Sequence, residues 1–308
     1  MDKDPKALKR LGSTFRVQAL YSDVEELLAE QDIDILDIVT PGFTHYPLAE
    51  LAIGKGVNVL VEKPLTLSVK DAELLRVHSE REGVSVCVIQ NYRFRKPLLK
   101  LMNLLARGEI GSIGAVNFTV RGGSLFNNPA WFWDENKSGG ILYELAIHEA
   151  DLQTLLMGRH EKVLSVWKDF DRGLRILKGI VALVRYSENR VATLDLRWFS
   201  SSPLFRMDVL ATVTDVTIKF NPDSIAILEG ERTPYYEFKG ELKRMIDYGI
   251  QVSKGKVRVS YSEPHRAIFE AFAKSVESKT SPPVGIEGVL PGLSLLEDLK
   301  NSSSTVSS

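Results

Sequence analysis

The sequence has a single cysteine and no long hydrophobic run. Cys87 is the only cysteine among 308 residues and lies in the apolar run VSVCVIQ, which excludes an internal disulfide and favours a core position in a reducing compartment. The N-terminus MDKDPKALKR is too charged for the apolar part of a signal peptide. No run reaches the roughly 18 apolar residues of a membrane span. We therefore expect a cytoplasmic protein that has no membrane partner.

The sequence also lacks an excess of charge of either sign. Lys and Arg number 39 against 40 Asp and Glu, for a formal net charge of -1, and no long basic cluster is present. This charge balance gives no electrostatic footprint for nucleic acid or for an anionic membrane surface. With 44% hydrophobic and 26% charged residues, the composition is that of a soluble globular protein of one large or two medium domains.

Helical and strand patterns alternate from residue 22 to about residue 107. Ser22 and Glu25 form a capping box for a helix at EELLAEQ. The runs IDILDIVT, VNVLV and VSVCVIQ are short, apolar and rich in β-branched residues, so they predict strands. Further helices are expected at LAELAIGKG, over 68–82 with Ser68 as its cap, and after Pro97. Apolar strands separated by amphipathic helices indicate a parallel sheet that is covered on both faces.

The pattern changes in the second part of the chain. Residues 112–121 and 161–238 contain alternating runs such as SIGAVNFTVR, KGIVALVRYS and RVATLDLRWF, which indicate a mostly antiparallel sheet. We place the boundary near Gly108 to Gly111, so the predicted domains are 1–110 and 111–308. A last helix, from about Pro264 to Val276, is expected to pack back on either domain. Only the tail NSSSTVSS has the composition of a disordered segment.

Each of the three predicted parallel strands is followed by polar residues. The first strand leads into TPGFTH at 40–45, the second into EKP at 62–64, and the third into QNYR at 90–93. Ligands of open parallel sheets bind outside the carboxyl ends of the strands, where loops and helix N-termini converge. Each ending also has a structural interpretation, since Pro41 and Pro64 would simply end strands. Their coincidence at one edge favours a binding site.

The segment GGILYELAIHEAD at 139–151 carries an unusual set of ionisable groups. Glu144, His148 and Asp151 stand at helical positions i, i+4 and i+7 and therefore form a column on one face. The column must face water, a ligand or its own members. Two alternatives are a metal site, which Glu, His and Asp ligands would suit, and a structural helix whose polar groups bond to the backbone. No second His or Cys cluster accompanies the column, so we expect no metal.

Together, TPxxxH, EKP, NYRF and SGGILYELAIHEAD resemble the motifs of the Gfo/Idh/MocA family of NAD(P)-dependent oxidoreductases, which act on sugars, polyols and related compounds. Their order and spacing match that family from about Asp2 to the final helix. The resemblance implies an α/β protein with an incomplete Rossmann-type parallel sheet domain followed by an α+β domain with a large open-faced, mostly antiparallel sheet. The active site is then expected in the cleft between the domains, with NAD or NADP as cofactor and a small molecule as substrate.

Two residues match the family's catalytic positions. Lys63 takes the place of the lysine in the EKP motif, and His148 that of the histidine in GGxxxDxGxHxxD. The sequence departs from the usual pattern at three positions: Glu144 replaces an aspartate, Ala146 a glycine and Gly42 a frequent asparagine.

Oxidation of an alcohol requires a base with a pKa near the working pH, and histidine starts there. We therefore assign His148 as proton acceptor, Lys63 as the donor that orients the hydroxyl, and Glu144 as the group that orients either of them. The residues expected to contact substrate are Lys63, Arg93, Trp131, Trp133, Glu144, His148 and Asp151. Those expected to contact cofactor are Asp2, Thr40, Pro41, His45, Glu62, Lys63 and Asn91.

Alternatives stay open for several of these residues. Trp131 and Trp133 would stack on a sugar ring or belong to a core or interface. His45 would approach the cofactor or have a buried structural role, and Asp151 would anchor its helix or touch substrate. The other histidines, His78, His160 and His265, are expected at the surface or as helix caps. The open face of the second sheet predicts a homodimer or homotetramer, because a large half-apolar face is rarely left in water.

The glycine-rich turn of a dinucleotide site is missing from the front of the sequence. Such a site begins with a strand, a GxGxxG turn and a helix that binds the pyrophosphate, but Gly12 is the only glycine before Gly42. The pattern aligns Met1 with the end of the family's second strand, so Asp2 would bind the ribose and favour NAD over NADP. Two explanations are open: a truncated gene model, or a shortened protein that lost dinucleotide binding and serves in binding or assembly.

Overall fold

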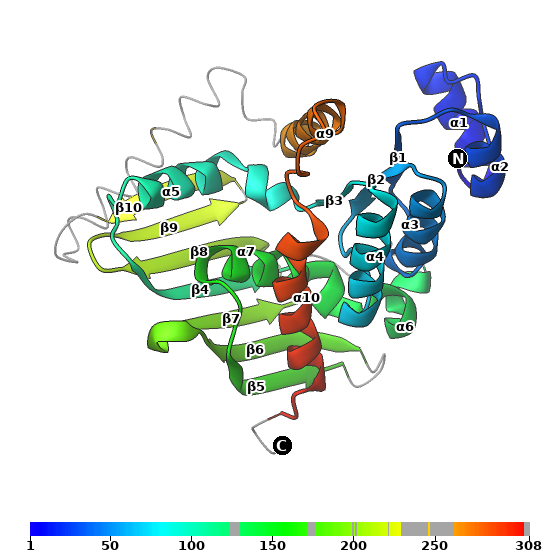
Figure 1. Cartoon of the computed structure of the whole chain (residues 1–308). Helices are drawn as coiled ribbons and strands as arrows, with labels where there is room; N and C mark the ends of the chain where they lie inside the picture. The colour runs from blue at the N-terminus through cyan, green and yellow to red at the C-terminus, as the bar shows by residue number, and fades with distance from the viewer. Residues whose placement is uncertain are drawn as a thin grey trace.

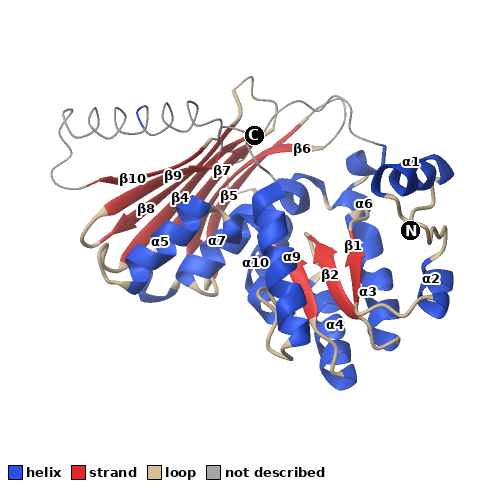
Figure 2. Ribbon diagram, turned by 90° about the horizontal axis from the view of Figure 1, so that it is seen from above, coloured by secondary structure: helices blue, strands red, loops and turns tan. Residues whose placement is uncertain are grey.

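The computed structural model describes residues 1–122, 130–171, 176–198, 200, 202–220, 222–228, 246 and 262–304. Within these ranges the chain forms a three-stranded sheet of order β1-β2-β3 and a seven-stranded sheet of order β10-β9-β8-β4-β7-β6-β5. The two sheets lie side by side, and helix α10 (Ile286–Asn301) runs between them (Figures 1 and 2). None of the described helices is long and apolar enough to cross a bilayer.

The small sheet confirms the predicted parallel pairing. Its strands β1, β2 and β3 are all parallel, and every residue of β3 is buried. Helices α3 and α4 connect them, and α4 begins after Ser68, whose hydroxyl accepts a hydrogen bond from Asp71 N at 3.1 Å. The bounds are Ile35–Ile38 for β1, His45–Gly54 for α3, Asn58–Glu62 for β2, Val69–Glu82 for α4 and Val86–Ile89 for β3.

Two helices precede the small sheet, α1 (Pro5–Phe15) and α2 (Val24–Glu30). The sequence patterns gave no prediction for α1, which Asp4 caps by accepting from Lys6 N at 2.9 Å. The capping box at Ser22 was wrong, because Asp23 accepts from the backbone N–H groups that begin α2. Asp and Ser are equally good N-caps, so the sequence pattern alone does not decide which of these two neighbouring residues caps the helix.

The large sheet is mostly antiparallel, as predicted, with one parallel pair between β4 and β7. Helices α5 (Lys96–Ala106), α7 (Ile147–Met157) and α10 lie along one face of it (Figure 2). Because α5 packs against β9 and β10, it lies with the second sheet. The predicted limits 1–110 and 111–308 stay a prediction. The strands are Ile113–Arg121, Lys162–Phe170, Leu177–Arg185, Val191–Arg197, Leu204–Ala211, Asp215–Phe220 and Asp223–Leu228, numbered β4 to β10.

Two C-terminal helices pack against the small sheet, and α10 also contacts the large one. Helix α9 (Ser262–Glu277) matches the predicted last helix and packs on β2 and β3 of the small sheet. Helix α10 was not predicted, since Pro291 and two glycines interrupt its pattern. A Cβ at Gly292 would come within 3.2 Å of the Asp151 backbone nitrogen, so glycine permits the close approach of α10 and α7. His160 was wrongly expected at the surface, because it is buried with Nε2 2.7 Å from the Asp298 carboxylate of α10.

Candidate functional site

The site forms where the small sheet meets helix α7. Thr40, Lys63 and Asn91 follow the carboxyl ends of β1, β2 and β3, respectively. Parallel strands bring these three endings to one edge. Facing that edge, a π-helical turn over Leu142–Ala146 leads directly into α7. Single π turns are frequent at functional sites.

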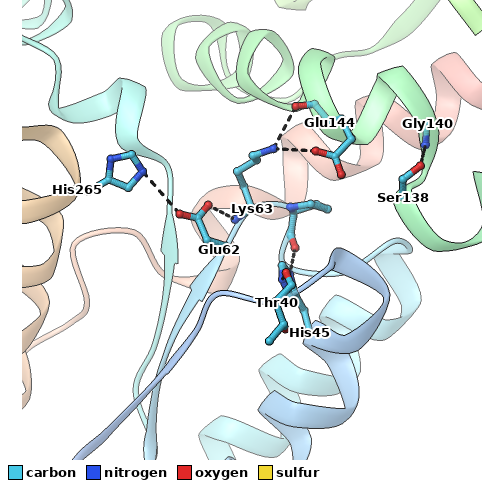
Figure 3. A network of polar contacts seen from close by, with 9 residues as sticks. Thr40, His45, Glu62, Lys63, Ser138, Gly140, Glu144 and His265 are labelled. Carbon is cyan, nitrogen blue, oxygen red and sulfur yellow. Dashed lines mark hydrogen bonds and ion pairs between the residues drawn. The ribbon is translucent and has the colours of Figure 1, made fainter. Parts of the chain in front are cut away.

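Lys63 reaches from the end of β2 to the turn that precedes α7 (Figure 3). Its Nζ donates to the backbone oxygen of Glu144 at 3.1 Å and lies 3.3 Å from the Glu144 carboxylate. The two side chains keep 19% and 16% of their surface exposed, so the pair is partly shielded but open to a small molecule. Glu144 therefore contacts Lys63, and its predicted role of orienting Lys63 or His148 stays a prediction.

His148 lies one helical turn beyond Glu144. Its ring centroid is 4.5 Å from that of Tyr92, which follows β3. The ring atom Nδ1 is buried and has no hydrogen-bond partner. Burial lowers the pKa of His148 well below its usual range, and the nearby charges of Lys63 and Arg95 lower it further. The imidazole is therefore neutral near pH 7, which is the form that accepts a proton.

Asp151 ends the column and has a different partner. Arg93 donates through Nε to Asp151 Oδ2 at 2.8 Å and through a terminal nitrogen to Oδ1 at 2.6 Å. The same guanidinium donates to the backbone oxygen of Gly288 on α10 at 2.8 Å. The pair thus ties the end of β3 to both α7 and α10. The contact of Arg93 or Asp151 with substrate stays a prediction.

These contacts split the column of ionisable groups in two. Glu144 is held at Lys63 and Asp151 at Arg93, so the three side chains do not converge on one point. In the part of the chain that the structure describes, no group of three His, Cys, Asp or Glu residues is arranged to hold a metal ion.

His45 is buried beneath the same edge. Its Nδ1 lies 2.7 Å from the carbonyl oxygen of Pro64, and its Nε2 lies 2.7 Å from that of Thr40. The ring thereby links the end of β1 to the loop after β2 that carries Lys63 (Figure 3). These contacts favour the structural alternative for His45, and its contact with a cofactor stays a prediction.

A second polar group lies on the other side of Lys63. Glu62 accepts from the Lys63 backbone N–H at 3.2 Å, and its Oε1 lies 3.6 Å from His265 Nε2 (Figure 3). His265 Nε2 is also 3.3 Å from Asn91 Nδ2. His265 lies in the first turn of α9 with 40% of its side chain exposed, as expected of a surface residue, and it also contacts two predicted cofactor residues. A separation of 174 residues from Asn91 gives no local sequence signal for this contact.

Three further residues were predicted to contact a ligand. Asp2 accepts from Asp4 N at 2.9 Å at the start of α1. Trp131 packs on Phe132, with ring centroids 6.1 Å apart. The side chain of Trp133 lies outside the described part of the structure. The ligand contacts assigned to these three residues stay predictions.

Glu149 is an ionisable residue of the site that the sequence patterns did not single out. Its side chain is buried, with 1% of the residue exposed, and Oε2 has no hydrogen-bond partner. Burial raises the pKa of Glu149 to about 8, although a hydrogen bond from its own backbone and the charge of Lys63 oppose this shift. The signal available in the sequence was a charged residue on the largely apolar helix after His148.

Comparison with known proteins shows which family the chain belongs to. Residues 1–90 match the family described as "Oxidoreductase family, NAD-binding Rossmann fold", and residues 98–215 match the "GFO/IDH/MocA C-terminal domain". The chain belongs to the Gfo/Idh/MocA oxidoreductase family. The family's NAD-binding fold accords with the strand-end residues described above, and the buried, unpartnered Oδ1 of Asn91 fits the nicotinamide end of such a cofactor.

Two curated members of the family show how far the likeness extends. D-apiose dehydrogenase of Rhizobium rhizogenes is 28% identical over 158 residues, which is 51% of this chain and 45% of that protein. A 1-carboxy-3-chloro-3,4-dihydroxycyclohexa-1,5-diene dehydrogenase of Comamonas testosteroni is 28% identical over 193 residues, 62% of this chain and 48% of that protein. The chain thus spans about half the length of these relatives.

Two solved structures of family members share the fold. The WlbA dehydrogenase from Bordetella pertussis, in complex with NADH and UDP-GlcNAcA, aligns with a TM-score of 0.81 at 19% identity, over 98% of this chain and 86% of that chain. Levoglucosan dehydrogenase, in complex with NADH and levoglucosan, aligns with a TM-score of 0.82 at 14% identity, over 97% and 85% of the two chains. At these identities the likeness supports the fold alone.

Proposed function

We propose that the protein is an NAD(P)-dependent oxidoreductase that transfers hydride between a nicotinamide cofactor and a sugar, polyol or related cyclic alcohol. One observation carries the proposal: Lys63 Nζ of the first domain contacts Glu144, on the turn that leads into the helix bearing His148. The site thus offers alcohol oxidation a base in His148, a hydrogen-bond donor in Lys63 and a carboxylate in Glu144. The alternative, a non-catalytic binding or assembly protein, is not favoured, since the named curated relatives are dehydrogenases.

The neutral imidazole of His148 removes the hydroxyl proton of the bound alcohol. Lys63 donates a hydrogen bond to the same oxygen, and its contact with Glu144 fixes the direction of that donor. Glu62 and Asn91, at the ends of β2 and β3, would hold the nicotinamide end of the cofactor, which when bound takes up or supplies the hydride. In the reverse direction the imidazolium of His148 returns the proton to the carbonyl oxygen.

Cofactor binding is the first test of this function. NADH titrated into the purified protein is expected to give a saturable change in nicotinamide fluorescence, and NADPH a weaker one, because the carboxylate of Asp2 repels a 2′-phosphate. Replacing Asp2 by Asn is expected to reduce this preference. The absence of a saturable signal up to millimolar concentrations of both cofactors would contradict the proposal.

Replacement of Lys63 separates an enzyme from a binding protein. In Lys63→Ala we expect kcat/KM for a sugar or polyol substrate to fall by about a hundredfold or more, since the hydroxyl loses its orienting donor. Lys70→Ala, at an exposed position of α4, is the matched control and should leave turnover unchanged. Circular dichroism checks that both variants fold. If Lys63→Ala keeps full turnover, the assignment of this residue is refuted.

The oligomeric state and the cellular location belong to the same proposal. The large sheet presents polar cross-strand pairs, including Asn117 with Thr193 and Arg121 with Asp195, and we propose that this sheet forms a homodimer or homotetramer. Light scattering of the purified protein tests this, and a monomer would speak against it. A cytoplasmic location is proposed from Cys87, which is a free, buried thiol.

A further inference from the structure

His265 brings helix α9 against two residues that follow strands of the small sheet. Its Nε2 lies 3.3 Å from Asn91 Nδ2, beyond the end of β3. The same nitrogen lies 3.6 Å from Oε1 of Glu62, at the end of β2 (Figure 3). Residue 265 falls outside both segments that match the family, 1–90 and 98–215, and the reaction proposed above gives this side chain no task.

The packing of α9 fixes where His265 lies. Ile268 and Phe272 stand three and seven residues further along the helix, so they share its face with His265. Both are completely buried, and α9 contacts β2, β3 and the 3-10 turn η2 (Asn91–Phe94). The imidazole is therefore carried to the edge of the small sheet by a well-packed helix.

The distances show which neighbour His265 serves. Glu62 Oε1 at 3.6 Å is beyond hydrogen-bond range, whereas Asn91 Nδ2 at 3.3 Å is within it. The amide nitrogen of asparagine is only a donor, so Nε2 of His265 has to accept, and the imidazole carries its proton on Nδ1. In its neutral form His265 therefore accepts a hydrogen bond from the Asn91 amide.

This bond decides which way the Asn91 amide faces. The two polar atoms lie on opposite sides of one planar group, so Oδ1 faces away when Nδ2 is held by His265. Oδ1 is buried and has no hydrogen-bond partner, and a buried acceptor left unpaired is costly. The carboxamide of a nicotinamide ring carries the N–H donor that this oxygen lacks. A reversed amide would set one donor against another.

We propose that His265 is a positioning residue that acts through Asn91: it holds Nδ2, so that Oδ1 is the atom presented to the carboxamide N–H group of the nicotinamide. The inference rests on the proposed function, because it takes Asn91 as a contact of the cofactor. His265 has no part in proton or hydride transfer. Without it the Asn91 amide is free to turn, and only one of its two orientations suits the cofactor.

NMR of the intact protein, without substrate or cofactor, tests the hydrogen bond. At about pH 9, where an ordinary histidine is neutral, the ¹⁵N signals of His265 should show the proton on Nδ1 and none on Nε2. The side-chain amide signals of Asn91, assigned with Asn91→Asp, should shift in His265→Ala. Asn58 is the internal control, because its Nδ2 donates to the backbone oxygen of Asp34 at the far end of the small sheet, and its signals should stay in place.

Calorimetric titration of two ligands tests the effect on the cofactor. ADP-ribose keeps every part of NADH except the nicotinamide. In His265→Ala the dissociation constant of NADH should rise by about three- to tenfold, while that of ADP-ribose should not change. His265→Gln offers Asn91 an acceptor at a similar place and should keep most of the NADH affinity. Arg266→Ala, an exposed neighbour on α9 that pairs with Glu270, is the matched control and should bind both ligands normally.

The outcomes separate this inference from the function it rests on. A proton on Nε2 of the neutral ring, or Asn91 signals that ignore His265→Ala, overturns the inference whether or not a cofactor binds. Equal weakening of NADH and ADP-ribose also overturns it, because the change then disturbs the whole site. If the Asn91 signals depend on His265 but neither ligand binds the unsubstituted protein, the orientation of Asn91 by His265 stands and the proposed function fails.

Discussion

Replacing Asp151 by alanine is expected to lower the free energy of unfolding by about 3–5 kcal/mol, because it leaves the buried charge of Arg93 without its partner. The Asp151 side chain is 2% exposed and that of Arg93 14%. Both carboxylate oxygens accept from the guanidinium, a bidentate geometry that is stronger than a single ionic contact. The variant also weakens the link from η2 (Asn91–Phe94) through α7 to α10.

Urea unfolding measures this change, with a surface ion pair as control. Arg76 contacts Glu80 one helical turn away on α4, and the two side chains keep 30% and 56% of their surface exposed, so Arg76→Ala should cost about 1 kcal/mol or less. A double replacement, Arg93→Met with Asp151→Leu, should recover most of the lost stability, because it removes both buried charges. If Asp151→Ala is as mild as Arg76→Ala, the pair does not hold η2, α7 and α10 together as described.

The elements that local patterns predicted are those stabilised by local physics. Ser68 caps α4 as expected, since its hydroxyl satisfies a free N–H group at the helix start. The three apolar strands pair in parallel because they are hydrophobic on both faces and alternate with amphipathic helices. The contact of Lys63 with Glu144 followed from the family resemblance, since nothing local joins residues 81 positions apart.

The features that were missed depend on long-range packing. Pro291 argues against a helix, yet α10 forms because it buries Leu293, Leu295 and Leu296 between the domains, and such packing outweighs local propensity. Likewise, His265 reaches Glu62 only through the placement of α9 on the small sheet.

The stability of the protein is expected to fall as pH rises through neutrality, and Glu149 is the cause. Its pKa is 4.5 in the unfolded chain and about 8 in the folded protein. Between these values the folded state holds a proton that the unfolded state has released, so the free energy of unfolding decreases with increasing pH. The contribution is complete below about pH 4.5 and lost above about pH 8, a total of about 5 kcal/mol at 1.36 kcal/mol per pKa unit.

Glu149→Gln removes this titration and should therefore flatten the pH dependence. Urea unfolding at about pH 5 and about pH 9 gives the loss of stability for each protein, and the difference between the two losses isolates Glu149 because all other groups titrate in both. The buried amide costs the same at either pH and cancels. Glu287→Gln, at an exposed position of α10, should behave like the unsubstituted protein. Equal losses in Glu149→Gln and the unsubstituted protein would mean that the Glu149 carboxyl is already ionised in the fold, and its burial would then not be the cause of the pH dependence.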